Sequence, residues 1–543
     1  MSAGGGAGTE TGTGLLLRWS IRIDRLVLAG WVLGIVVVVA VTSAGIARLY
    51  PSAELRQGLV AGLAAAPAVR ALIGTIPADS VAGLTAWRIG VFGGAAVGIM
   101  AVLLLVRRTR ADEENGRTEL LLTTAVTRSA PLRAGLLLTG GASLAVGTLS
   151  ATVLVAAGRP VAGAVLFGGC LAGCGLVFAG LAAVTAQVFG TARTASAVAA
   201  ASVGLTYALR AVADVAPGPG GSGGLSWLGG LGWLSPLGWL ERAEAFGANR
   251  FGVLLLYVAA AAALMATAAG LARRRDVGLA LVPARRGPAA GPRLTSALAL
   301  AARMHRGGLL GWSAGLFVIG VLTGTLADSV VPVVADNPAL ADYLELLGGA
   351  PGVADAFVGA MAGVAGLLAA AAGVSTGLRA AGEERAGRAE LVLTGAVPRT
   401  RWLLGHGLFA LLIPAAGLLA AGVAAGVGHG LAAGRVAAGA DALRIMLTQL
   451  PAALVVAALA IAVTGLRVAL AGVAWLVLAG VVLLQELGPL LGWPAAVLAL
   501  NPFHSLPVTA AAPFPWVSEL VLLAMAAGLL TIGGWGLRRR DVG

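Results

Sequence analysis

Long apolar segments, separated by short polar ones, dominate this chain of 543 residues. A helix that crosses a bilayer needs about 20 predominantly apolar residues, and many of these segments have that length. The pattern predicts an all-α integral membrane protein with twelve transmembrane helices. We place six spans in the first half, at 26–46, 87–106, 134–157, 163–188, 195–213 and 251–272, and six in the second half, at 309–331, 356–378, 402–426, 442–465, 468–487 and 517–537.

Two polar motifs occur once in each half of the chain. Residues 112–128 follow the second span and match residues 383–399 at ten of seventeen positions without a gap. We call these two segments the polar blocks. Arg-Arg-Arg-Asp-Val-Gly follows the last span of each half, at 273–278 and 538–543. Because each half has an even number of spans, we predict two parallel six-helix repeats related by a pseudo-two-fold axis along the membrane normal.

The predicted domain organisation follows this repeat. Residues 1–13 are expected to be a disordered leader, because they are small and polar and lack the basic segment of a signal peptide. The first six-helix repeat should span 14–278 and the second 294–543. Between them, residues 279–293 are rich in Pro, Gly and Arg, which predicts a linker.

Several segments that flank the spans carry their own patterns. Residues 15–25 are amphipathic and basic, which predicts a short interfacial helix, although a plain positively charged anchor is the alternative. Residues 214–250 and 488–516 are apolar but interrupted by Pro and Gly and contain several Trp residues. Such segments are typical of re-entrant or interfacial hairpins. Residues 332–355 are acidic and contain no arginine.

The charge distribution favours a membrane protein over a nucleic-acid-binding one. Only 11% of the residues are charged, against about 25% in soluble domains, and the net charge is +13. All 37 basic residues are arginines, and with the predicted spans 27 of them fall on the side of the polar blocks and 10 on the other. This asymmetry follows the positive-inside rule. Both termini and both polar blocks are therefore expected to be cytoplasmic.

Few residues point to chemistry within the chain itself. Without lysine, the chain has no phosphate-loop lysine and no Schiff base. Cys170 and Cys174 lie one helical turn apart in an apolar span, which is typical of small packing residues. The four scattered histidines do not form a metal-binding pattern with them. We therefore predict no catalytic residues and no metal site.

The polar blocks have the pattern of a short helix with a charged end and an apolar continuation. Glu113 and Arg117 are four residues apart, as are Glu384 and Arg388, and this spacing stabilises a helix. A helix of this kind can bind in a groove of a partner protein. The alternative is a solvated turn between two spans. Repetition in register favours the docking interpretation, because a spacer does not need the same residues at the same positions.

The polar blocks, the arginine-rich endings and the segment Ser235-Pro236-Leu237-Gly238-Trp239 together resemble the fused twelve-span permeases of ABC-2 type exporters, in particular exporters of polyketide antibiotics. The resemblance covers nearly the whole chain. It implies that the amphipathic segments 15–25 and 294–306 are interface helices. It implies that the segment after the second span of each half is a coupling helix that binds a cytoplasmic ATPase. The implied coupling residues are Glu113, Gly116, Arg117 and Glu119 in the first half and Glu384, Gly387, Arg388 and Glu390 in the second.

The resemblance also implies partners, cargo and location. Two copies of a separate ATPase subunit would hold ATP and Mg²⁺, since this chain carries no such site. The cargo would be an apolar or amphipathic small molecule, such as an antibiotic or drug, exported across the bacterial plasma membrane. One difference between the blocks is that Arg385 stands where the first block has Glu114, so the two docking sites need not be equivalent.

Polar residues at the ends of spans are candidates for the transport path. Charges inside a span cost about 2.5–3.5 kcal/mol at its centre and usually have a function. Arg210 and Asp214 lie at the outer end of the fifth span, and Gln485 and Glu486 at the comparable end of the eleventh. They are candidates for an outer gate, with an ion pair that merely anchors the helix as the alternative.

Two other classes of protein share parts of this pattern. A twelve-span secondary transporter driven by protons also has parallel halves, but it normally needs a protonatable carboxylate deep in a span, which the sequence does not clearly supply. A membrane-embedded enzyme that acts on lipid-linked substrates would need a cluster of Asp, Glu or His at the interface. An ATP-driven export permease therefore remains the leading hypothesis.

Overall fold

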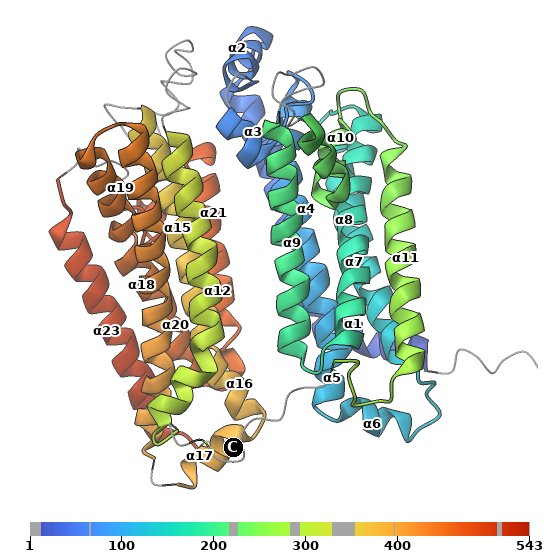
Figure 1. Ribbon diagram of the computed structural model, residues 1–543, viewed down its shortest axis with the longest axis vertical. Helices are drawn as coiled ribbons and strands as arrows, with labels where there is room; N and C mark the ends of the chain where they lie inside the picture. Colours follow the sequence, from blue (N-terminus) through green and yellow to red (C-terminus); the bar gives the residue numbers. More distant parts are fainter. Residues whose placement is uncertain are drawn as a thin grey trace, which may run out of the picture. The chain divides into compact units, whose positions relative to one another are not determined.

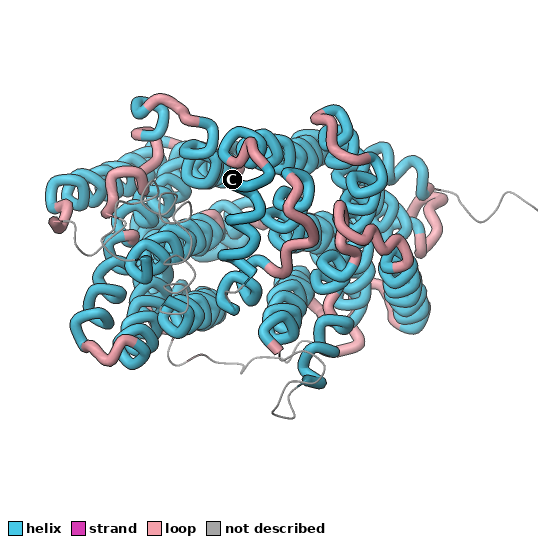
Figure 2. The backbone as a smooth tube through the Cα atoms, turned by 90° about the horizontal axis from the view of Figure 1, so that it is seen from above, coloured by secondary structure: helices cyan, strands magenta, loops and turns pink. Residues whose placement is uncertain are grey.

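The computed structural model describes residues 12–64, 67–216, 226–282, 291, 294–327, 353–395, 397–507 and 513–541. Within these ranges the chain forms helices and loops (Figure 2), apart from one isolated β-bridge between Phe189 and Val282. Twelve helices are long and apolar enough to cross a membrane. The predicted all-α fold class with twelve spans is therefore confirmed. Most of the predicted leader at 1–13 and of the acidic segment at 332–355 lies outside the described residues.

The helices form two compact units, Met1–Gly287 and Pro288–Gly543. The boundary between them falls within the predicted linker at 279–293. Each unit contains six of the twelve long helices. The pseudo-two-fold axis remains a prediction, and each unit is described separately below.

In the first unit, α8 lies at the centre of the bundle and packs against α4, α7, α9 and α11 (Figure 1). The short helices α2, α3 and α10 gather at one end of this unit, whereas α5 and α6 lie at the other, which we call the block end. The elements are α1 (Thr13–Leu49), α2 (Ala53–Ala64), α3 (Pro67–Ile73), α4 (Val81–Arg108), α5 (Arg110–Glu114), α6 (Arg117–Leu122), α7 (Ala130–Ala156), α8 (Val161–Val188), α9 (Ala192–Val215), the 3-10 helix η1 (Ser226–Leu234), α10 (Pro236–Arg242) and α11 (Val253–Arg274).

The second unit pairs α12 with α18 and α20 with α23 most extensively. Its block end carries α16 and α17 (Figure 1). The elements are α12 (Ala297–Leu326), α15 (Val353–Gly377), α16 (Arg379–Arg385), α17 (Arg388–Leu393), α18 (Arg399–Ala432), α19 (Val436–Thr448), α20 (Leu450–Leu466), the 3-10 helix η3 (Val468–Leu470), α21 (Val473–Leu491), α22 (Ala495–Leu498) and α23 (Trp516–Arg539).

The prediction of separate interfacial helices at 15–25 and 294–306 is wrong. One unbroken helix, α1, covers 13–49, and α12 likewise runs from Ala297 into its span. Extending an existing helix costs little, and neither stretch contains a proline to stop it. Asp24 also fixes the first turns of α1, because its fully buried carboxylate accepts a 2.5 Å hydrogen bond from Nε of Arg108 on α4.

Small residues allow the long helices to approach closely. A methyl group added at Gly147 of α7 would overlap the carbonyl oxygen of Gly168 on α8. In the second unit, a methyl group at Gly320 of α12 would overlap the carbonyl oxygen of Ala421 on α18. Contact between backbones is the usual source of stability where lipid removes the hydrophobic driving force between helices. The high Gly and Ala content of the spans is therefore used in packing.

The two predicted outer hairpins pack into the ends of their bundles. In the first unit, Pro236 and Leu237 of α10 are buried, and the Tyr257 hydroxyl donates a 2.6 Å hydrogen bond to the Pro236 carbonyl. In the second unit, Asn501 and Phe503 follow α22 and are also buried. In both segments a residue followed by proline, Ser235-Pro236 or Asn501-Pro502, lies where the segment enters the bundle. This shared position explains why the pair recurs.

Candidate functional site

Each polar block folds as two short helices joined by a sharp turn at a shared glycine. In the first unit α5 ends at Glu114 and α6 begins at Arg117, and Gly116 between them has a φ of 72°. In the second unit Gly387 has a φ of 68° at the same point between α16 and α17. Residues with a Cβ atom are disfavoured in this left-handed region. This geometry explains the glycine that both blocks share.

The predicted ion pairs four residues apart do not form. Arg117 instead contacts Asp112 with an N–O distance of 3.0 Å, and Arg388 contacts Glu383 at 2.8 Å. The expected pairing with Glu113 required one continuous helix. Because the chain turns at Gly116, Arg117 starts a second helix, and its side chain reaches back over five residues to Asp112.

Glu113 and Glu384 point into their units and bind the arginine-rich endings. Glu113 is buried, and both of its carboxylate oxygens accept hydrogen bonds from Arg275, at 2.6 and 2.8 Å. Glu384 is equally buried and bound through both oxygens by Arg540, with Nη2 to Oε2 at 2.7 Å. Arg275 and Arg540 are the third arginines of the two Arg-Arg-Arg-Asp-Val-Gly motifs. The two repeated motifs are therefore each other's binding partners.

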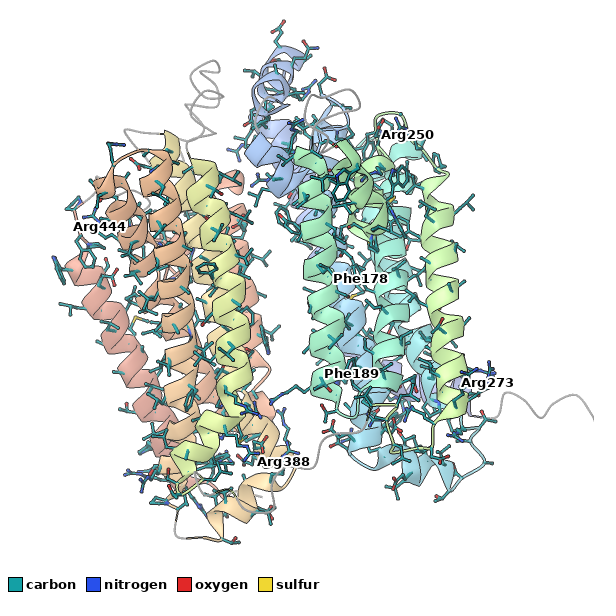
Figure 3. All side chains as sticks on the ribbon, in the orientation of Figure 1. Phe178, Phe189, Arg250, Arg273, Arg388 and Arg444 are labelled. Atoms are coloured by element: carbon teal, nitrogen blue, oxygen red, sulfur yellow. The ribbon has the colours of Figure 1, made fainter. Side chains whose placement is uncertain are left out.

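The exposed part of each block is a Glu-Leu pair. Leu120 of α6 is 72% exposed and Leu391 of α17 is 78% exposed, and both follow exposed glutamates, Glu119 and Glu390. Arg117 and Arg388 are also more than half exposed. Figure 3 shows Arg388 at the block end of the second unit and Arg273 at that of the first. A partner protein could directly contact the exposed charged members of the predicted coupling set, which are Arg117, Glu119, Arg388 and Glu390.

At one position the two blocks carry opposite charges, Glu114 in the first and Arg385 in the second, and both side chains fit the same fold. The Glu114 carboxylate accepts a 2.9 Å hydrogen bond from the Ala192 backbone N–H at the start of α9. At the corresponding position Arg385 donates to the Val468 carbonyl at the start of η3. Both side chains remain exposed. The two blocks thus share the pair of short helices but differ in surface charge by two units at this position.

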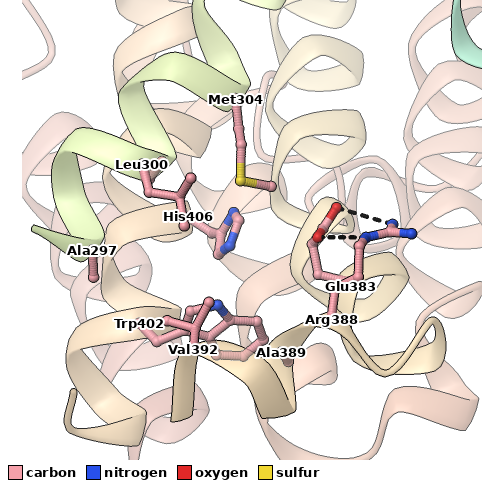
Figure 4. A pocket seen from close by; sticks show the side chains of 10 residues that line it. Ala297, Leu300, Met304, Glu383, Arg388, Ala389, Val392, Trp402 and His406 are labelled. Carbon is pink, nitrogen blue, oxygen red and sulfur yellow. Dashed lines mark hydrogen bonds and ion pairs between the residues drawn. The ribbon is translucent and has the colours of Figure 1, made fainter. Parts of the chain in front are cut away.

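A second difference lies beside the block of the second unit. His305 of α12 and His406 of α18 are buried and share a 3.0 Å hydrogen bond. Figure 4 shows His406 with Trp402 and the Glu383–Arg388 ion pair around a small cavity. At the position of His305 the first unit has Asp24. Within the described residues no three His, Cys, Asp or Glu side chains are arranged to hold a metal ion.

At the end of the first unit opposite the block, Arg210 is the centre of a buried ionic cluster. Its guanidinium lies 3.1 Å from the Asp214 carboxylate and 2.8 Å from that of Glu241 on α10, and all three side chains are at least 93% buried. It also donates to the carbonyls of Ala71 and Leu72 at the end of α3. Arg210 therefore joins α3, α9 and α10. Sequence reasoning placed Arg210 and Asp214 together but did not identify Glu241.

At the comparable end of the second unit, the predicted gate residue Gln485 belongs to a neutral pair. Asn501 donates a 2.6 Å hydrogen bond from its side-chain amide to the Gln485 carbonyl oxygen. Gln485 thus joins α21 to the segment after α22, as Arg210 joins α9 to α10. Glu486 is exposed.

Substitution of the turn glycines provides a first test of the block geometry. We expect Gly116→Ala and Gly387→Ala each to lower the free energy of unfolding by about 1–2 kcal/mol, because alanine must adopt a left-handed backbone. A methyl group at either position has no close neighbour, so crowding does not contribute. Thermal unfolding of the purified protein in detergent measures the change. Gly141→Ala, also uncrowded but inside α7, is the control and should stabilise instead. A stabilising Gly116→Ala would contradict the assignment.

Two six-span units, each with a polar block at one end and a buried polar joint at the other, form a multi-pass membrane protein. The chain is 40% identical over 537 residues to the multidrug efflux system permease protein Rv1217c of Mycobacterium tuberculosis (strain ATCC 25618 / H37Rv), with 98% of this chain and 95% of that protein covered. The family described as multidrug efflux system permease Rv1217c, C-terminal domain, matches residues 294–538. The chain therefore belongs to the multidrug efflux system permease family.

Proposed function

We propose that this permease is the membrane-spanning component of an ATP-driven exporter, in which two copies of a cytoplasmic ATPase subunit bind the two polar blocks. The observation that carries the proposal is the exposed Glu-Leu pair at the same point of each block, Glu119-Leu120 and Glu390-Leu391. A leucine that is mostly exposed beside charged residues at the end of a membrane helix bundle is suited to burial in a partner's groove.

The absence of lysine from the chain supports a separate energy source. A phosphate-loop ATPase needs a lysine at the nucleotide phosphates, and this sequence has none. ATP and Mg²⁺ would therefore be bound by the partner subunits. Two blocks in one chain favour two copies of that partner. The arginine asymmetry supports a cytoplasmic location of the blocks and of both termini, in a protein of the bacterial plasma membrane.

An apolar or amphipathic small molecule is the cargo that suits this chain best. The spans are built mainly from Ala, Gly, Val and Leu, and the related protein from M. tuberculosis is named as a multidrug efflux permease. A small ion or sugar would need polar groups along the path. The described spans bury mainly Ser and Thr as polar groups and offer few charged ones outside the clusters at their ends.

Proton-driven transport is a second candidate, and one observation favours it. Glu241 is buried beside Asp214, and the two carboxylates have one arginine, Arg210, in contact with them. Burial raises the pKa of Glu241 to about 8, and the Asp214 carboxylate adds to this effect, whereas Arg210 opposes it. A carboxyl group with such a pKa can bind and release a proton near neutral pH. It is a candidate coupling site for a secondary transporter.

Transport into inside-out membrane vesicles distinguishes the two candidates. The permease is expressed with and without its ATPase subunits, and uptake of a fluorescent amphipathic drug is measured with ATP or with an imposed proton gradient. We expect uptake with ATP, only when the ATPase subunits are present, and unaffected by a protonophore. Uptake that needs only the proton gradient would overturn the proposal and support the second candidate.

A further inference from the structure

The arginine that ends each last span is more than a charged membrane anchor. In both units it lies at the meeting point of three elements: the polar block, the end of the fourth span and the end of the sixth. Arg275 follows α11, binds Glu113 of the block through both carboxylate oxygens, and donates from Nε to the side-chain carbonyl of Gln187 near the end of α8, at 2.7 Å. The side chain of Arg275 is only 11% exposed.

The second unit repeats this arrangement with different partners on the fourth span of that unit. Arg540 follows α23 and binds Glu384 through both carboxylate oxygens. It also donates to the backbone carbonyls of Thr464, at 3.1 Å, and Gly465, at 2.8 Å, at the end of α20. Two independent copies of the same three-way joint argue that the joint itself is required, because the residues on α8 and α20 differ while the geometry is retained.

Additional contacts close the joint from the other side of the block. The last arginine of each polar block, Arg128 or Arg399, donates to the backbone carbonyl of Arg275 or Arg540. In the first unit the chain beyond Arg275 also contributes, because the Gly278 N–H donates to Glu113 at 2.7 Å. Each block is therefore bound at both ends to the residues that follow the last span.

We propose that Arg275 and Arg540 are positioning residues that transmit displacement of the polar block to the fourth and last spans of their unit. We call the two joints, Glu113–Arg275 and Glu384–Arg540, the clasps. This inference rests on the proposed function, in which the block moves with a bound ATPase. An arginine is suited to this role, because its planar fork binds a carboxylate at two points while Nε binds a third group.

The two clasps differ in a way that sharpens the test. Glu113 has a second cation, Arg110, at 3.1 Å, and Arg110 also donates to the Gly190 carbonyl just after α8, at 2.7 Å. Arg110 lies two residues before the first block, and the equivalent position before the second block is Ala381. In the second clasp Arg540 binds Glu384, whereas in the first clasp both Arg110 and Arg275 bind Glu113. Loss of Arg540 should uncouple its unit fully, whereas loss of Arg275 should do so only in part.

Transport and ATP hydrolysis by the full permease–ATPase complex in proteoliposomes test the proposal. We expect Arg540→Gln to reduce drug transport about tenfold, Arg275→Gln by about twofold, and Arg110→Gln combined with Arg275→Gln again by about tenfold. The complex should still assemble and hydrolyse ATP, but without stimulation by drug. Arg274→Gln and Arg539→Gln, at the exposed arginines next in the chain, are the controls and should transport normally. Equal effects of Arg275→Gln and Arg274→Gln would overturn the proposal.

Two further measurements keep the test independent of folding defects and of the energy source. Arg540→Lys keeps the charge but cannot bind Glu384 and Gly465 together, so it should fold, assemble and still lose drug-stimulated hydrolysis. Amide hydrogen exchange of the polar block in the permease alone should rise in Arg540→Gln and stay unchanged in Arg539→Gln. Unchanged exchange in Arg540→Gln would refute the clasp whatever drives transport. Failure of ATP-driven uptake by the wild-type complex would refute the proposed function instead.

Discussion

Replacing Arg210 with methionine is expected to cost the first unit about 3–5 kcal/mol of stability, because it leaves the carboxylates of Asp214 and Glu241 buried without their cation. The same change removes the donors that bind the end of α3. Thermal unfolding of the purified permease in detergent measures the loss. Arg250→Met is the control, since Arg250 forms an exposed ion pair with Glu244 at 3.0 Å near the same end and should contribute less than about 1 kcal/mol.

The loss of stability in Arg210→Met should be larger at high pH than at low pH. Burial raises the pKa of Glu241 from an ordinary value of 4.5 to about 8 in the folded protein. A carboxyl whose folded pKa is raised contributes stability that is complete below its unfolded pKa and is lost as pH rises through the folded pKa. Without Arg210 the folded pKa of Glu241 should rise further. Wild type already loses stability up to a pH of about 8 as Glu241 ionises, so the two proteins should diverge mainly above that pH. Lowering the pH from about 9.5 to about 7 should therefore recover part of the deficit of the variant relative to wild type.

A deficit that is the same at both pH values would contradict this account and show that Arg210 acts mainly through the α3 carbonyls. Arg210→Lys separates the two contributions in another way. Lysine keeps the charge between the carboxylates but cannot reach both of them and the carbonyls of Ala71 and Leu72 together. We expect it to lie between wild type and Arg210→Met at every pH.

The spans were predictable from the sequence because length and hydropathy leave few alternatives for twenty apolar residues in a row. The continuation of α1 through residues 15–25 was not predictable, because an amphipathic pattern there suits both a surface helix and the end of a long span. Burial of Asp24 against Arg108 decides between these possibilities. That contact joins residues 84 positions apart, and no local pattern contains it.

The position of the polar blocks was predictable from their repetition, but the direction of their side chains was not. Spacing rules for ion pairs assume a continuous helix, and the turn at Gly116 invalidates that assumption for Glu113 and Arg117. One signal could have identified the actual partner. The third arginine of the ending motif recurs with the block in both halves, so Arg275 and Arg540 were available as partners for two glutamates of unassigned role.

Glu241 shows a different limit of sequence reasoning. It lies 31 residues from Arg210, beyond a long glycine-rich segment, and it recurs nowhere in the second half, where Gln485 and Asn501 take the corresponding place. An unrepeated charged residue in an outer loop is usually solvated. Only the fold of α10 into the bundle buries this one.

Leu120→Asp combined with Leu391→Asp is expected to abolish binding of the ATPase subunits while the permease stays folded. Both side chains are more than 70% exposed and make no contribution to the core, so stability should change by less than about 0.5 kcal/mol. A buried leucine at the centre of a partner's groove, in contrast, cannot be replaced by a charge. Co-purification of the ATPase with the permease, quantified against wild type, measures the loss.

Leu234→Asp and Leu431→Asp are matched controls, because these leucines are 67% and 79% exposed but lie at the ends away from the blocks. They should retain the ATPase.

The single variants carry more information than the double one, because Glu114 and Arg385 make the two block surfaces differ in charge. If both ATPase copies are identical, Leu120→Asp and Leu391→Asp should weaken binding to different degrees, and exchanging the charges with Glu114→Arg and Arg385→Glu should reverse the order. Full ATPase binding by the double leucine variant would show that the docking surface lies elsewhere than at the exposed Glu-Leu pairs.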